Sequence, residues 1–142
     1  MRTVFLIGGT GFIGKQLVKE LAKEDVKILL LVRSKSKAIR IFQERGILKK
    51  AVMHFIEGDL TKIDLGLSAE DKERVLKTDV IIHAGGPMDI QVTSKEAASV
   101  FLNGAKHISE LAKSIHQLKG LQQFIHVVGY MSPLMIKIAR LR

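Results

Sequence analysis

One stretch near the start of the chain limits its possible folds more than any other. An apolar run from Val4 to Ile7 leads into glycines at positions 8, 11 and 14, and an amphipathic segment follows them directly. This order predicts a strand, a tight loop and a helix. At this spacing the first glycine permits the turn, the second lets a pyrophosphate approach the backbone, and the third lets the helix pack on the strand.

The same loop predicts a ligand. The unpaired N–H groups at the start of a helix, together with the positive end of its dipole, favour a phosphate. Glycines by themselves also mark ordinary turns, but here a strand precedes them and a helix follows, which is the context that the phosphate-binding motif requires. We therefore expect a dinucleotide at this loop, bound through Gly8, Thr10, Gly11, Phe12, Ile13 and Gly14.

Strand and helix patterns alternate along the rest of the chain. Further strands are predicted at 27–32, 52–57, 79–84 and 124–128, and helices at 12–23, 38–43, 68–77 and 94–117. Ser68 is a predicted N-cap. In the first helix one apolar face comprises Ile13, Leu17, Val18 and Leu21. The pattern predicts an α/β fold, a Rossmann-type doubly wound parallel sheet with strand order 3-2-1-4-5.

Composition narrows the function further. The 142 residues fit one domain, and the absence of cysteine excludes disulfides and thiolate metal sites. No signal peptide or membrane span is evident, so a cytoplasmic setting without membrane contact is the default. The net charge of +9 is spread over several predicted helices, without a nucleic-acid-binding motif, and nucleic acid is not an expected partner. The five histidines lack metal-ligand spacing, so no metal site is expected.

The end of the second predicted strand bears on the choice of cofactor. Domains that prefer NAD usually carry an acidic residue there for the ribose hydroxyl, whereas this chain has Arg33, 19 residues after Gly14. Its guanidinium could hold a 2'-phosphate bidentately. The alternative is a solvated basic loop. Position favours the first interpretation, and we expect NADP(H) to be preferred, with NAD(H) also possible.

Taken together, these motifs resemble a known family. Gly8 to Gly14, Leu31-Val32-Arg33, Gly58-Asp59-Leu60 and His83 to Gly86 are similar to motifs of extended short-chain dehydrogenases/reductases. The thioester reductase and fatty acyl-CoA reductase branch is most similar, because its Gly-Asp-Leu turn precedes an Asp-Leu-Gly-Leu-Ser segment, here 64–68. The resemblance implies that Asp59 and Leu60 flank the adenine, that the cofactor cleft is lined by Ala84, Gly85 and Gly86, and that the family's helix asparagine is Asn103.

The chain departs from this family where catalysis is expected. The family's fifth strand ends in a Ser or Thr, but Val128 and Gly129 stand here, and the single tyrosine, Tyr130, is followed four residues later by Leu134 rather than Lys. The resemblance therefore implies a C-terminally incomplete fold without catalytic residues of its own. We expect a cofactor domain at 1–130 and a basic tail at 131–142, which is either a truncated or frame-shifted end or a cap over a sheet edge.

Three functions are compatible with these observations. The first is the NADP(H)-binding domain of a reductase for acyl thioesters or related carbonyl compounds, which would act on substrate only with a C-terminal half. The second is a sugar-nucleotide epimerase or dehydratase-like domain, and the third is a non-catalytic regulatory module that binds a dinucleotide. The segment 64–68 and Arg33 favour the reductase.

Overall fold

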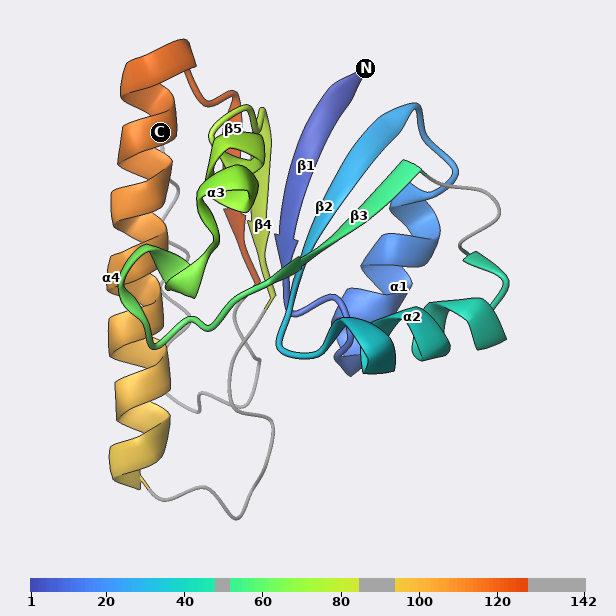
Figure 1. Ribbon diagram of the computed structural model, residues 1–142, viewed down its shortest axis with the longest axis horizontal. Coiled ribbons are helices and arrows are strands. Elements are labelled where there is room, and N and C mark those ends of the chain that lie inside the picture. The colour runs from blue at the N-terminus through green and yellow to red at the C-terminus, as the bar shows by residue number, and fades with distance from the viewer. Residues whose placement is uncertain (48–51, 85–93, 128–142) are drawn as a thin grey trace.

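The computed structural model describes residues 1–47, 52–84 and 94–127, and they form an α/β domain (Figure 1). Its parallel sheet has the order β3-β2-β1-β4-β5, which confirms the predicted topology. The elements follow one another as β1 (Arg2–Ile7), α1 (Phe12–Leu21), β2 (Val26–Val32), α2 (Lys35–Glu44), β3 (Val52–Glu57), the short 3-10 segment η2 (Ile63–Gly66), α3 (Ala69–Val75), β4 (Val80–His83), α4 (Ser94–Lys119) and β5 (Gln123–His126).

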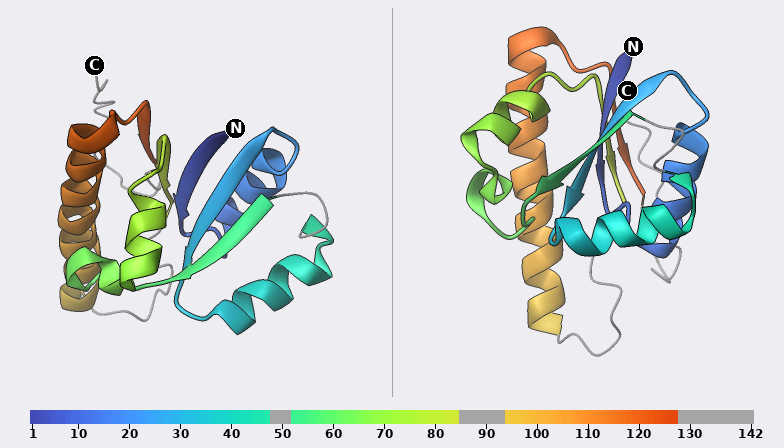
Figure 2. Two further views of the ribbon diagram at one scale, coloured as in Figure 1. Left: turned by 45° about the horizontal axis from the view of Figure 1, so that its top comes forward. Right: turned by 45° about the vertical axis from the view of Figure 1, so that its right-hand side comes forward.

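Helices cover both faces of the sheet. α1 and α2 lie on one face, and α3 and α4 lie on the other (Figures 1 and 2). Val18 and Phe42 belong to the apolar core beneath α1 and α2, whereas Ile108 and Ile115 belong to the core beneath α4. Because both faces of the central strands are covered, β2 is apolar on both sides, and all residues from Ile28 to Val32 are buried.

The carboxylate of Asp79 stabilises the end of the sheet at which β1 and β4 begin. Asp79 Oδ2 accepts from the Thr3 N–H at 2.8 Å, and Oδ1 accepts from Lys119 Nζ. The Lys119 ammonium also donates to the carbonyl of Lys77 at 3.0 Å. These contacts tie β1, β4 and the end of α4 together, which leaves the carboxyl ends of the strands as the edge where loops can bind a ligand.

The predicted element boundaries agree with the structure to within three residues. β3 spans the predicted residues, and Ser68 caps α3 by accepting from the Asp71 N–H at 3.1 Å, as expected. β5 ends at His126, earlier than predicted, although the Val127 N–H still donates to the His83 carbonyl at 2.9 Å. Val128 lies outside the described residues, as does the expected tail at 131–142.

Candidate functional site

The glycine loop joins β1 to α1 as the sequence predicts. Gly8 has a φ of +83°, in the left-handed region that favours glycine, and its carbonyl accepts from the Gly11 N–H at 3.1 Å. A Cβ on Gly14 would lie 1.9 Å from the Gly8 oxygen and 2.6 Å from the Gly9 Cα. α1 therefore packs directly on the loop backbone, in the way the third glycine of such a motif permits.

The start of α1 is open to an anion. Gly11 is the N-cap, no side chain within the described ranges caps this end, and the first turn contains no acidic residue. Thr10 is partly exposed beside it, and Phe12 is 78% exposed. Val18 is buried, whereas Ile13, predicted on the same apolar face of the helix, is 44% exposed. It lies in the first turn of α1, too close to the loop to reach the core that Val18 enters.

The turn after β3 holds its carboxylate firmly. Asp59 Oδ1 accepts from the Thr61 N–H at 2.9 Å and from the Thr61 hydroxyl at 2.7 Å, and Arg33 Nη2 lies 3.9 Å away. The hydrogen bonds from Thr61 lower the pKa of Asp59, and the nearby Arg33 charge acts in the same direction. The Asp59 side chain is thus an ionised acceptor at neutral pH, as contact with an adenine amino group would require.

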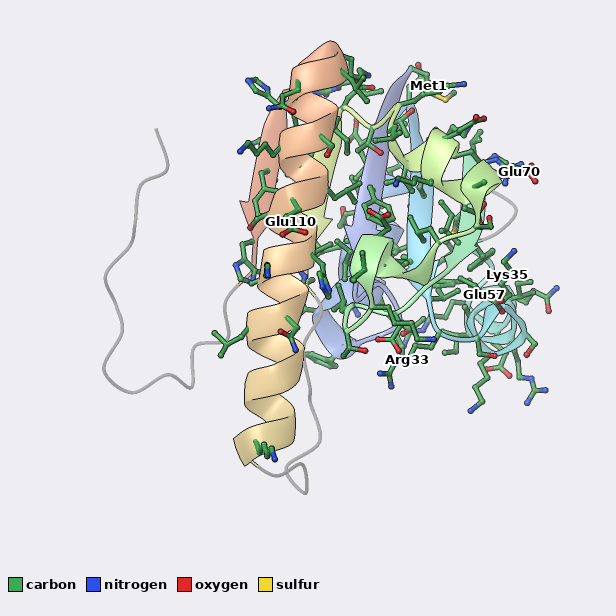
Figure 3. All side chains as sticks on the ribbon, turned by 60° about the vertical axis from the view of Figure 1, so that its left-hand side comes forward. Met1, Arg33, Lys35, Glu57, Glu70 and Glu110 are labelled. Atoms are coloured by element: carbon green, nitrogen blue, oxygen red, sulfur yellow. The ribbon has the colours of Figure 1, made fainter. Side chains whose placement is uncertain are left out.

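A pocket of about 490 Å³ lies between the ends of β2 and β3. The register pairs Val32 with Glu57, which places Arg33 next to the turn that follows β3. The Lys35 N–H, at the start of α2, donates to Glu57 Oε1 at 3.3 Å, and Figure 3 shows both residues there near Arg33. The pocket lining comprises Arg33, Glu57, Gly58, Asp59, Lys62 and Gly66.

A short segment next to this pocket was not predicted. Asp64 and Leu65 have φ values of +51° and +56°, so two consecutive non-glycine residues adopt the left-handed conformation inside η2. The Leu65 side chain is buried, and its carbonyl accepts from the Asp59 N–H at 2.8 Å. The Asp-Leu-Gly-Leu-Ser segment therefore supports the backbone of the turn after β3.

The other predicted cofactor residues follow β4 in the sequence or lie in α4. The Ala84 N–H donates to the Ile7 carbonyl at 2.9 Å, which places Ala84 beside the start of the glycine loop. Gly85 and Gly86 lie outside the described residues. Asn103 is exposed on α4, one residue before Gly104, which packs against Leu60. The structure thus brings Arg33, Asp59 and Leu60 to the same edge of the sheet as the glycine loop.

A stacked histidine pair at the ends of β4 and β5 was also missed. The rings of His83 and His126 are 4.7 Å apart between centroids and 3° from parallel. His83 is buried, and desolvation, with a smaller contribution from His126, lowers its pKa to about 4. His83 is therefore neutral at physiological pH. Each histidine is the last residue of its strand, and this was the signal in the sequence. The stack follows from it only when the register that pairs His83 with His126 is known.

Within residues 1–47, 52–84 and 94–127, no three His, Cys, Asp or Glu side chains are grouped so that they could hold a metal ion. In the same ranges no helix is both long and apolar enough to cross a bilayer.

Comparison with known proteins identifies the family. The sequence profile of the male sterility protein family matches residues 6–135. The chain belongs to this family. This male sterility domain is 30% identical, over 141 residues, to the fatty acyl-CoA reductase wat of Drosophila melanogaster, covering 87% of the chain and 27% of that protein. It is 27% identical to human fatty acyl-CoA reductase 1 over 145 residues, with 89% and 27% covered. The chain spans about a quarter of the length of these curated relatives.

Solved structures agree with the fold of this male sterility domain. The terminal R domain of the myxalamid PKS-NRPS biosynthetic pathway is 26% identical, with a TM-score of 0.64 over 89% of this chain and 33% of that one. Yeast methylglyoxal/isovaleraldehyde reductase Gre2, solved in complex with NADPH, shares the fold at 24% identity, with a TM-score of 0.71 and coverage of 90% and 37%. The chain is thus an extended short-chain dehydrogenase/reductase-type NAD(P)-binding domain, related to the fatty acyl-CoA reductases.

Proposed function

We propose that this chain is the NADP(H)-binding domain of a reductase that acts on acyl thioesters or related carbonyl compounds. The proposal rests on the glycine loop: Gly8 turns the backbone, Gly14 lets α1 approach it, and no side chain in the described part of the chain caps the helix start at Gly11. A pyrophosphate is the ligand that such an end favours. The reductase activity is supported by the names of the relatives, which are fatty acyl-CoA reductases.

Each part of the site takes one part of the dinucleotide in this proposal. The glycine loop, with Thr10, Phe12 and Ile13, holds the pyrophosphate, and Asp59 and Leu60 hold the adenine. Arg33 holds the 2'-phosphate, which is the reason to propose NADP(H) over NAD(H). Ala84, Gly85 and Gly86 line the cofactor cleft and leave room for the ribose and pyrophosphate, and Asn103 is the cofactor-binding asparagine of α4 in this proposal. When bound, the nicotinamide ring supplies the hydride for carbonyl reduction.

Binding and turnover are separate in this proposal. Residues 1–130 form the cofactor domain, and 131–142 are a basic tail. A carbonyl that accepts hydride needs a hydrogen-bond donor and an acid for its oxygen. Positions 128 and 129 are Val and Gly, and Tyr130 has Leu134 four residues later. Residues 1–142 by themselves therefore bind the cofactor without reducing a substrate, and the substrate-reducing groups come from elsewhere.

Calorimetric titration with NADPH and NADH tests this function. We expect both to bind, and NADPH more tightly. Arg33→Ala should remove about 1.5 kcal/mol of NADPH affinity, the lower end for a charge-assisted hydrogen bond because the side chain is 78% exposed. The affinity for NADH should not change. Lys35→Ala is the matched control, since it removes an exposed cation two residues away and should affect NADPH binding much less.

Two results would contradict the proposal. If neither dinucleotide binds, the site has been assigned to the wrong ligand. If Arg33→Ala weakens NADPH and NADH equally, Arg33 does not read the 2'-phosphate, and the preference for NADP(H) loses its basis.

A further inference from the structure

We propose that His107 of α4 is a positioning residue for the adenine-binding turn, an inference that rests on the proposed function. His107 Nδ1 lies 2.7 Å from the carbonyl oxygen of Leu60, although the two residues are 47 positions apart in the sequence. The contact is partly buried between α4 and the turn. It links the helix on one face of the sheet to the turn at the end of β3.

The chemistry of this contact fixes which atom carries the proton. A carbonyl oxygen only accepts, so Nδ1 must carry the hydrogen and donate it to Leu60. A neutral ring then has its acceptor at Nε2, and a protonated ring donates from both nitrogens. The Nδ1–H donor is present in either case, so the contact does not depend on the charge of the ring.

The turn is held from two sides, and His107 provides the second. Two backbone hydrogen bonds connect the turn to the residues that follow it. The Asp59 N–H donates to the Leu65 carbonyl at 2.8 Å, and the Lys62 N–H donates to the Asp59 carbonyl at 3.1 Å. These bonds set the shape of the turn, and the Gly58 N–H, which donates to the Val32 carbonyl at 3.0 Å, ties its start to β2. His107 instead fixes its place relative to a helix that packs on the sheet.

The backbone of α4 comes close to the turn one helical turn before His107. A Cβ added to Gly104 would lie 3.4 Å from the Cβ of Leu60, an ordinary contact distance. The helix therefore lies against Leu60 at Gly104 and donates a hydrogen bond to it at His107. Asp59 precedes Leu60 directly, so a shift of the turn moves the carboxylate that is proposed to accept from the adenine amino group.

Binding of NADPH and of its deamino analogue separates positioning from a general structural role. The analogue carries hypoxanthine, which lacks the amino group that Asp59 is proposed to bind. His107→Leu should weaken NADPH binding by about five- to tenfold, the value of one lost hydrogen bond. It should weaken binding of the analogue by less than about twofold, because the misplaced carboxylate has no amino group to lose.

Two further variants complete the test. His107→Asn places an amide N–H near the position of the ring Nδ1–H, so its NADPH affinity should stay within about twofold of the unsubstituted protein. His116→Leu is the matched control: His116 also lies on α4, but its Nδ1 accepts from the Leu121 N–H at 3.1 Å, near the end of the helix. It should leave both affinities unchanged.

The outcomes distinguish this inference from the function on which it rests. If the unsubstituted protein binds NADPH and His107→Leu binds both dinucleotides unchanged, the positioning role is wrong and the proposed function stands. Equal losses for the two dinucleotides, or a failure of Asn to restore binding, overturn it as well, because they indicate general damage to the domain. If the unsubstituted protein binds neither dinucleotide, the proposed function fails first.

Discussion

Two alanine substitutions in the glycine loop separate packing from ligand binding. At Gly14 a Cβ would lie 1.9 Å from the Gly8 carbonyl oxygen and 2.6 Å from the Gly9 Cα, and both neighbours are backbone atoms that have no alternative rotamer. At Gly11 the nearest atom is again the Gly8 oxygen, but at 3.3 Å. Gly11 has φ −75° and ψ 175°, an extended conformation that alanine adopts without strain.

These contacts give different magnitudes for the two variants. Relief of the overlap at Gly14 requires the loop and α1 to move apart, and overpacking of this kind costs about 1–3 kcal/mol. The overlap with backbone atoms is severe and places the cost at the upper end of this range; alanine recovers up to about 1 kcal/mol of helix propensity, so we expect a net loss of about 2 kcal/mol. For a domain of this size the melting temperature should fall by about 5–8 °C. Gly11→Ala should change the free energy of unfolding by less than about 0.5 kcal/mol.

For NADPH affinity we expect the larger loss from Gly11→Ala, the variant with the smaller expected effect on stability. A methyl group at Gly11 adds to the backbone face on which the pyrophosphate is proposed to lie, and the NADPH affinity should fall at least about tenfold, or 1.4 kcal/mol. Thermal melts with and without NADPH measure both effects, because a ligand at 100 times its Kd stabilises the folded protein by about 2.7 kcal/mol. An unchanged melting temperature for Gly14→Ala would refute the packing argument. Unchanged affinity for Gly11→Ala would refute the placement of the pyrophosphate.

Two other predictions concern turnover and pH. Residues 1–142 should show no protein-dependent NADPH oxidation with acyl-CoA or aldehyde substrates; steady oxidation that disappears in Gly11→Val would contradict this. Asp79→Asn should lower the free energy of unfolding by about 1–2 kcal/mol at neutral pH. The control Asp25→Asn, at an exposed position, should change it little. The Lys119 and Thr3 hydrogen bonds lower the pKa of Asp79, so its contribution is complete above the ordinary value of 3.8 and is lost as pH falls through the lower folded value. Denaturant titrations from neutral pH to below 3.8 should show that the difference in unfolding free energy between Asp79→Asn and the unsubstituted protein shrinks in acid. A difference that does not change with pH would contradict the role assigned to Asp79.

The sequence predicted those features that depend on local pattern. The run from Val4 to Ile7 and the spacing of the glycines determine the strand, the loop and the helix, and the alternation of elements determines the sheet order. Ser68 could be identified as an N-cap because capping acts over three residues. The strand, the loop, the helix and the N-cap are each encoded within one short segment, and the sheet order follows from general rules for the connections between parallel strands.

The features that the sequence did not predict depend on contacts between distant segments. The left-handed pair Asp64 and Leu65 is unfavourable by local propensity, and it is compensated by burial of Leu65 and by the bond from the Asp59 N–H. The stack of His83 on His126 exists only in the register of β4 against β5. The His107 contact to Leu60 requires the position of α4 over the turn. The histidine stack and the His107 contact both join residues that lie far apart in the sequence.

The contact between Arg33 and Asp59 is weak enough to be compatible with the proposed role of Arg33 in binding a 2'-phosphate. The register of β2 against β3 brings them to 3.9 Å, but the Arg33 side chain is 78% exposed, and such a pair contributes only about 0–1 kcal/mol to stability. Asp59 is held by Thr61 and does not need Arg33 to stay in place. The guanidinium can therefore turn toward a 2'-phosphate at little cost to the fold. Arg33→Ala should accordingly leave the melting temperature nearly unchanged while NADPH affinity falls, and a large loss of stability would show that Arg33 serves the fold instead.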